Sequence, residues 1–188
     1  MATLNPKEFI QAVFINDLSG IMAIDKPYIS FMVMAIGIEF LGKCISLSQE
    51  WDEERVSRMR FEEAIKNIPA LHSYIPLLKE NNNYDLYVSL RCGLAHAAKP
   101  KYEITLSSKN ERAHLVTQDG RVNLKCEDFF ADFVAACREV IAMNFSSNED
   151  KMNKPFLAVP AISSNQTGTN PGSTLIGPMN IFNSSRGV

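Results

Sequence analysis

The sequence predicts a mainly helical fold, a bundle of four to five helices with a small antiparallel β-meander inserted before the last helix. Three observations favour this class. Apolar residues recur at intervals of three and four through most of the first hundred positions, which is the period of an amphipathic helix. From about 101 to 125 they alternate in short runs, as in strands. The helical period then returns from 126 to 145.

The first helix is predicted from Asn5 to about Gly20, because Asn5 can cap it and Pro6 suits its first turn. The second helix, from Tyr28 to Leu47, is apolar on nearly every side. Such a helix is buried, so we expect other helices or a second subunit to cover it. Its most regular apolar stripe consists of Ile29, Met32, Val33, Ile36, Phe40 and Leu41.

The remaining helices follow from charge, capping and proline signals. A charged helix is predicted over 51–68, followed by a short helix or turn after Pro69. Three asparagines at 81–83 can cap the next helix, which ends before Pro100 because the residue preceding proline avoids helical angles. Turn signals Ser-Lys-Asn and Gln-Asp-Gly separate the alternating runs of 101–125 and predict hairpins.

Composition changes sharply after Phe145. Residues 146–188 are rich in Ser, Asn, Gly, Thr and Pro, which is typical of a flexible segment. We therefore predict a domain over 1–145 and a tail over 146–188 that the domain does not need in order to fold. Two apolar runs, 156–162 and 173–182, are suited to packing in extended form, so the order of the tail stays open.

Charge and cysteine content restrict the function classes. The net charge is −2, so the chain has no general basic field for nucleic acid, and any such contact must be local. The four cysteines form no C-x-x-C pair, which argues against a zinc or redox motif and favours reduced thiols. The beginning of the sequence lacks a signal-peptide pattern, and Glu39 and Lys43 interrupt the most apolar segment. We expect a cytoplasmic protein with no membrane span, metal or cofactor.

The segment Ser89–Pro100, "SLRCGLAHAAKP", carries the candidate chemistry. Arg91 supplies a permanently charged fork for phosphate oxygens, and His96 can move a proton near neutral pH. RNA brings its own nucleophile, the 2′-hydroxyl, so this pair suits phosphodiester cleavage without a metal. On an ideal helix the two positions lie roughly 140° apart, so a bend near Gly93 or a two-fold dimer would have to bring them together. The alternative is that both are structural and pair with carboxylates or carbonyls.

Neighbouring side chains have candidate supporting roles. Tyr87, one turn before Arg91, is placed to bond a phosphate or stack on a base. Lys99 can contact phosphates without sequence preference. Cys92 is four residues before His96, so a cysteine nucleophile is conceivable, although a cysteine on an apolar helix is usually part of the core.

Glu39 lies in an otherwise apolar helix and needs a partner if it is buried. Lys43, four residues later, and Arg91 are the two candidates. If the partner is Arg91, the glutamate orients the arginine. His72 and His114 have no helpful neighbours in the sequence, so we interpret them as surface or satisfied core residues.

The segment "LYVSLRCGLAHAAKP", with R-x4-H from Arg91 to His96, resembles the signature of the HEPN superfamily. The segments "YDLY" and "IGIEFLG" are also similar to bacterial HEPN-like proteins, and the resemblance covers roughly residues 5–145. It implies a helical bundle that forms homodimers in which two motifs meet in a cleft. It also implies that Arg91 and His96 are the catalytic pair. Cys92 departs from the family, because active members usually carry a polar residue directly after the arginine.

Two functions are therefore open. The first is a metal-independent endoribonuclease, which the resemblance associates with toxin–antitoxin, CRISPR or phage-defence systems and hence with a cognate antitoxin or other protein partner. The second is a non-catalytic dimeric module that binds RNA, a nucleotide or a protein partner through the same cleft. The intact Arg91 and His96 favour the first function, whereas the acidic composition and Cys92 favour the second.

Overall fold

The computed structural model describes residues 2–48, 50–51, 53–81, 84–101, 103–109, 111–145, 149–154 and 157–159. Helices dominate this part of the chain, and a small mixed sheet accompanies them, so the predicted mainly helical class is confirmed. Segments η1 and η3 are π-helical and η2 is a 3₁₀ helix. The helices are α1 (Pro6–Phe9), η1 (Ile10–Asp17), α2 (Leu18–Ala23), α3 (Pro27–Ile45), α4 (Ser57–Asn67), η2 (Pro69–Leu77), η3 (Tyr87–Cys92), α5 (Gly93–Ala97), α6 (Cys126–Ala142) and α7 (Glu149–Asn153).

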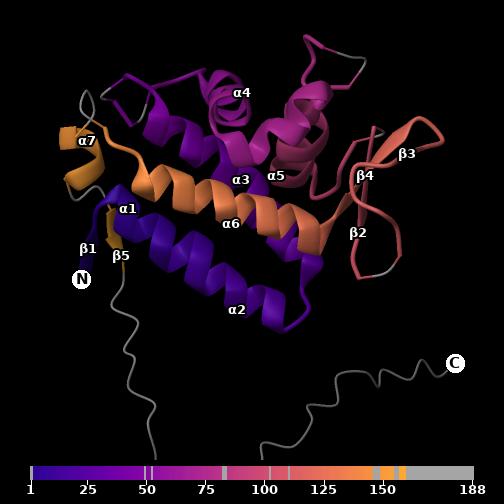
Figure 1. Cartoon of the computed structure of the whole chain (residues 1–188), viewed down its shortest axis with the longest axis horizontal. Coiled ribbons are helices and arrows are strands. Elements are labelled where there is room, and N and C mark those ends of the chain that lie inside the picture. Colours follow the sequence, from indigo (N-terminus) through magenta and orange to yellow (C-terminus); the bar gives the residue numbers. More distant parts are fainter. Residues whose placement is uncertain are drawn as a thin grey trace, which may run out of the picture.

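The first helix runs without interruption through α1, η1 and α2. Asn5 caps it as predicted: its Oδ1 accepts the Glu8 backbone N–H at 2.9 Å, and the Glu8 carboxylate accepts the Asn5 N–H at 2.9 Å. The helix continues past the predicted stop at Gly20 and ends at Ala23, close to Asp25, whose φ is 56°. In Figure 1 it lies below α6, with α4 above.

Helix α3 is the centre of the core and packs against α4 and α6. Its glycines allow this close approach, since a Cβ at Gly42 would lie 1.8 Å from the carbonyl oxygen of Arg60. Among the described residues it is the one helix long and apolar enough to cross a membrane, and 56% of that stretch is buried within the protein. Its core face comprises Phe31, Met34, Ala35, Ile38, Leu41 and Cys44.

The predicted apolar stripe of α3 is only partly buried. Ile29 and Ile36 are 49% and 46% exposed, because the face that meets α4 and α6 is centred on Met34, Ile38 and Leu41 instead. An apolar strip of α3 is therefore left at the surface.

The sheet corrects the predicted antiparallel meander. Strands β2 (Ile104–Ser107), β4 (Arg121–Lys125) and β3 (Thr117–Gln118) lie in the order β2-β4-β3, with β2 parallel and β3 antiparallel to β4. The Asp-Gly turn predicted at 119–120 is present, and both residues have positive φ. Strand β4 takes the middle because Val122 and Leu124 are buried, whereas β3 is exposed and forms an edge.

Two further elements follow the boundary predicted at residue 145. Helix α7 packs against α1, and Met152 is fully buried. Strand β5 (Leu157–Val159) pairs antiparallel with β1 (Ala2–Leu4), with Ala2 opposite Val159. Figure 1 places α7, β1 and β5 at one end of the molecule and the three-stranded sheet at the other. Residues 160–188 of the predicted tail lie outside the described residues.

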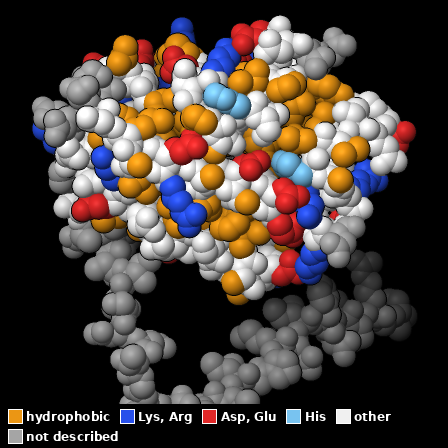
Figure 2. Space-filling model, in the orientation of Figure 1, with side chains coloured by type: hydrophobic (Ala, Val, Ile, Leu, Met, Phe, Trp, Pro, Cys, Tyr) orange, Lys and Arg blue, Asp and Glu red, His pale blue; other side chains and the backbone are white. Residues whose placement is uncertain are grey.

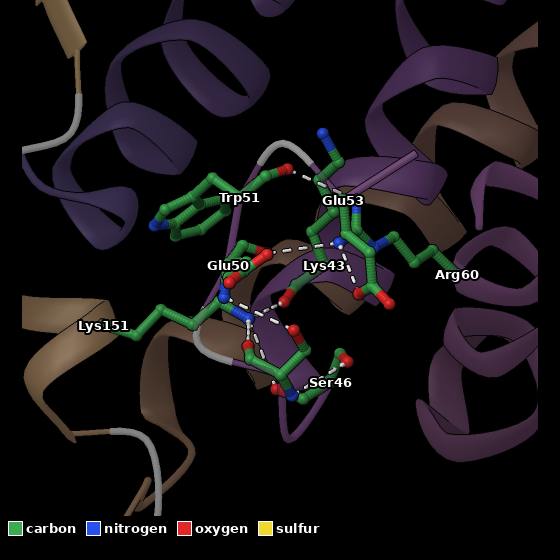
Figure 3. Close-up of polar contacts among 8 residues, drawn as sticks. Lys43, Ser46, Glu50, Trp51, Glu53, Arg60 and Lys151 are labelled. Atoms are coloured by element: carbon green, nitrogen blue, oxygen red, sulfur yellow. Dashed lines mark hydrogen bonds and ion pairs between the residues drawn. The ribbon is translucent and has the colours of Figure 1, made fainter. Parts of the chain in front are cut away.

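Helix α7 also delivers a lysine to the end of α3 (Figure 3). The ammonium group of Lys151 donates to the backbone carbonyls of Lys43, Ser46 and Ser48, and the last of these bonds is 2.7 Å long. It also lies 5.0 Å from the centre of the Trp51 ring. The side chain is buried, and this burial lowers the pKa of Lys151. The lysine thereby occupies the carbonyls that the end of a helix leaves unpaired.

Arg60 on α4 holds the adjacent part of the same loop (Figure 3). Its guanidinium donates to the carbonyls of Trp51 and Glu50 at 3.3 and 3.2 Å, and it meets the Glu53 carboxylate at 3.4 Å. Only 2% of the residue is exposed. Arg60 and Lys151, which we call the closed cation cluster, together fix the connection from α3 to α4.

Candidate functional site

The helix that carries the candidate motif begins at a charged cap. The Asp85 carboxylate accepts the Val88 backbone N–H at 3.0 Å, and both of its oxygens accept from the Arg58 guanidinium at 3.0 Å. These bonds hold the pKa of Asp85 below its usual value against the opposing effect of burial, and they raise the pKa of Arg58. The start of η3 is thereby anchored to α4.

Segment η3 is wound more widely than an α-helix. At its end the Gly93 N–H donates to the Val88 carbonyl, five residues earlier. Such π-helical turns are rare and occur often at functional sites. Because one turn holds more than four residues, positions five apart in the sequence come close to alignment.

Arg91, near the end of η3, and His96, on α5, meet, although an ideal helix would separate them. Nη1 of Arg91 lies 3.3 Å from Nε2 of His96. A guanidinium has no acceptor, so the arginine donates and Nε2 offers its lone pair. Arg91 is mostly buried, whereas His96 is exposed at the end of α5.

Glu39 of α3 fixes the arginine from the other side. Its Oε2 accepts from Nε of Arg91 at 2.7 Å, and only 7% of the glutamate is exposed. Of the two partners that the sequence left open, the structure pairs it with Arg91. Within the described residues, Nη2 of Arg91 has no hydrogen-bond partner. We call Glu39, Arg91 and His96 the open cation site, because one edge of the guanidinium is left for a ligand.

The other predicted residues differ in their distance from this centre. The Tyr87 ring centre lies 5.9 Å from the guanidinium carbon of Arg91. Burial and a hydrogen bond with the Cys92 side chain raise the pKa of Tyr87, so Cys92 is placed beside this tyrosine. Lys99 is exposed on the turn after α5. The structure thus brings Tyr87 to the open cation site and leaves Lys99 at its edge.

A second polar group, around His114, had no signal in the sequence. The Tyr74 hydroxyl donates to Asp132 at 2.7 Å and lies 2.9 Å from Nε2 of His114. Nδ1 of His114 accepts the Lys125 backbone N–H at 3.0 Å, so the ring proton is on Nε2. Burial lowers the pKa of His114. It is therefore a satisfied histidine that joins η2, α6 and β4, one of the two roles expected for it.

Comparisons of this protein with family models, curated proteins and solved structures found no match. Within the described part of the chain, no three His, Cys, Asp or Glu side chains are grouped as metal ligands. The geometry offers an exposed imidazole in contact with a guanidinium that a carboxylate orients and that has one open edge.

Proposed function

We propose that this protein is a metal-independent endoribonuclease of the HEPN type that acts as a homodimer in the cytoplasm. The observation that supports this proposal is the 3.3 Å contact between Arg91 and His96, with Arg91 oriented by Glu39. A base and a charge-stabilising donor that meet at one point suit phosphoryl chemistry. The helical fold and the R-x4-H motif agree with the resemblance seen in the sequence.

In this mechanism the phosphate of an RNA strand binds the open edge of Arg91. Nη1 of Arg91 turns from Nε2 of His96 to a phosphate oxygen, and Nε2 then takes the proton of the 2′-hydroxyl as O2′ forms a bond to phosphorus. The bond from phosphorus to O5′ then breaks, and O5′ receives a proton from the protonated His96 of a second copy. The products carry a 2′,3′-cyclic phosphate and a 5′-hydroxyl, so no external nucleophile is consumed. Arg91 stabilises the negative charge on the pentacoordinate phosphate.

The exposed strip of α3 supports the dimer. Ile29 and Ile36 lie seven residues apart on one face of the helix and are about half exposed. Ile36 precedes Glu39 by one turn, so a second copy packed on this strip would lie near the open cation site. Such a contact would supply the second His96 that the mechanism uses.

The second candidate is a non-catalytic dimeric module that binds RNA, a nucleotide or a protein partner such as a cognate antitoxin. Cys92 favours this function, since it directly follows Arg91, where active HEPN members usually carry a polar side chain. A thiol is a weaker hydrogen-bond donor than the polar side chains of active members, so it would contribute less to holding a phosphate.

The test is cleavage of a mixed pool of single-stranded RNA in the presence of EDTA. We expect fragments that end in a 2′,3′-cyclic phosphate, while DNA of the same sequence stays intact because it has no 2′-hydroxyl. His72→Ala is the matched control for His96→Ala, since both histidines are exposed. An RNA pool that the wild-type dimer leaves intact would favour the binding module. Cleavage that persists in His96→Ala would rule out this site.

A further inference from the structure

A cavity of about 550 Å³ opens beside the C-terminal end of α5. Its volume lies within the range of about 300–1,000 Å³ that is usual for small-molecule sites. It begins at Ala97, the residue after His96, and extends to β2 and β4. The residues that shape it are Tyr28, Lys99, Lys101, Ile104, Leu106 and Arg121.

Positive charge is concentrated around this cavity. Lys99, Lys101 and Arg121 line it, and none of its described lining residues is Asp or Glu. On the face in Figure 2, by contrast, basic and acidic side chains are interspersed among hydrophobic ones. Three cations in a lining whose described residues include no acid are a local exception in a chain of net charge −2. The ligand that this charge fits is an anion with more than one charged group.

The backbone holds the two lysines in place. The Lys99 N–H donates to the Gly93 carbonyl at 3.1 Å, and the Lys101 N–H donates to the Ser89 carbonyl at 2.9 Å. A Cβ at Gly93 would lie 2.6 Å from the Lys99 carbonyl oxygen, so glycine is required for this approach. The turn passes through Ala98 at a φ of 50°. The segment that leaves His96 therefore enters the cavity along a fixed path.

The apolar part of the cavity suits a planar ring. Tyr28 is 41% exposed, and its hydroxyl donates to the Ala98 carbonyl, which fixes the ring against the turn. Ile104 is buried beneath the cavity, and Leu106 is half-buried beside it. A base that stacks on an aromatic side chain while its phosphates meet cations is the usual mode of single-strand recognition.

We infer that this cavity binds one nucleotide of a single-stranded RNA, next to the phosphate held at Arg91 and His96. The inference rests on the proposed function for the position of the strand, since the cavity begins directly after His96. The base stacks on Tyr28 above Ile104, and Lys101 and Arg121 contact the phosphates on either side. The sheet thereby extends the cleavage site into a track for the substrate.

The first test measures binding of an eight-nucleotide RNA with 2′-O-methyl groups, which blocks cleavage, by fluorescence anisotropy in EDTA. Lys101→Ala and Arg121→Ala should each weaken binding about three- to tenfold, as for the loss of one charged contact. Each should also reduce the slope of log affinity against log salt by about 0.7 per lost phosphate contact. Arg138→Ala, which removes an exposed charge from α6 outside the cavity, is the matched control and should keep the wild-type affinity.

The second test separates stacking from folding. Tyr28→Phe and Tyr28→Ala both lose the hydrogen bond to Ala98, but only the alanine variant loses the ring. We expect Tyr28→Phe to bind RNA nearly as well as the wild type, and Tyr28→Ala to bind about fivefold or more weakly. Thermal melting of both variants checks that the difference does not come from unfolding.

Equal affinity for RNA in Lys101→Ala, Arg121→Ala and Arg138→Ala would overturn the inference, even if the wild type cleaves RNA. Binding of a mononucleotide as tight as that of the octamer would assign the cavity to a free nucleotide and overturn the RNA assignment. Conversely, loss of affinity in the cavity variants of a protein that cleaves no RNA would support the cavity as an RNA site and contradict the proposed catalysis.

Discussion

The closed cation cluster and the open cation site are built from similar parts and differ in what the cations meet. Both stabilise positive side chains against α3. In the cluster, Lys151 directs its ammonium at three backbone carbonyls, so its hydrogen-bonding capacity is filled by the chain. In the open cation site, Nε of Arg91 donates to Glu39 and Nη1 contacts the exposed His96. Nη2 has no hydrogen-bond partner among the described residues.

The difference teaches that burial and charge alone do not mark a functional cation. Lys151 is more deeply buried than Arg91, yet its surroundings leave no place for a ligand. A cation that the protein orients with one carboxylate but does not saturate is better placed to bind a substrate. If this is correct, substitutions in the closed cation cluster lower stability, whereas substitutions in the open cation site lower activity.

The largest expected effect is on activity at the open cation site. His96→Ala should lower the rate of RNA cleavage by about 10²–10⁴-fold, the usual contribution of a general acid or base. Because the His96 side chain is exposed, the melting temperature of the His96→Ala variant should stay near that of the wild type. Single-turnover cleavage and thermal melting on the same preparation measure both quantities. Loss of folding in His96→Ala would contradict the view that the open cation site serves activity and not stability.

The next largest effect concerns the exposed apolar strip of α3, on which a second copy is proposed to pack. Ile36→Glu should dissociate the proposed dimer, since two unpaired charges in an apolar interface cost on the order of 3–5 kcal/mol. The monomer should remain folded, because Ile36 is 46% exposed. Light scattering and circular dichroism test the two statements. A wild-type protein that is already monomeric at micromolar concentration would contradict the dimer.

A substitution in the closed cation cluster should instead lower the stability of the protein. Lys151→Ala leaves three carbonyls without their donor and should lower the free energy of unfolding by about 2–4 kcal/mol. Cleavage measured well below the melting temperature should stay within a factor of two. Lys79→Ala, on an exposed residue just after η2, is the matched control for the removal of charge. Equal destabilisation by both variants would show that the carbonyl contacts of Lys151 contribute little.

A smaller effect is expected when the hydrogen bond between Glu39 and Arg91 is weakened. Glu39→Gln keeps the shape of the side chain but replaces a charged hydrogen bond to Arg91 with a neutral one. We expect cleavage to fall about tenfold, which corresponds to about 1.4 kcal/mol of lost positioning. A positioning role also predicts that kcat falls while KM changes little. An equal fall in His96→Ala and in the double variant would show that the two residues act through one step.

The smallest effect is a dependence of stability on pH at His114. Burial holds its folded-state pKa below the ordinary value of about 6.5, so the folded protein binds fewer protons than the unfolded chain just below that pH. The contribution of His114 to stability is therefore fully present above about pH 6.5 and is lost as the pH drops toward the folded-state pKa. His114→Gln should flatten this slope in urea titrations between pH 7 and 5, whereas His72→Gln should leave it unchanged.

Much of the fold follows from local sequence. The Asn5 cap, the Asp-Gly turn and the amphipathic face of α6 depend on neighbours within a few positions, and the sequence predicts each of them. The order of the strands does not follow in this way. Strand β4 lies between the others because Val122 and Leu124 meet the core, and this depends on helices that lie far away in the sequence.

Some features of the candidate site likewise follow from local sequence, and others do not. Arg91 and His96 are recognisable as a pair of residue types, but an uninterrupted α-helical period does not predict their meeting at the junction of η3 and α5. The partner of Glu39 and the presence of Arg121 beside Lys101 require contacts over dozens of residues. Lys151 had no signal, because its ligands are backbone carbonyls, which every residue carries.

The π-helical winding of η3 also makes the motif a matter of length as well as of residue type. A π-helical turn holds about one residue more than an α-helical turn. Positions five apart on the wider turn and positions four apart on an α-helix therefore occupy nearly the same place on the surface. A chain one residue shorter between Arg91 and His96 would place the two positions four apart, the spacing at which side chains meet on an ordinary α-helix, so the winding and the spacing of the motif have to match.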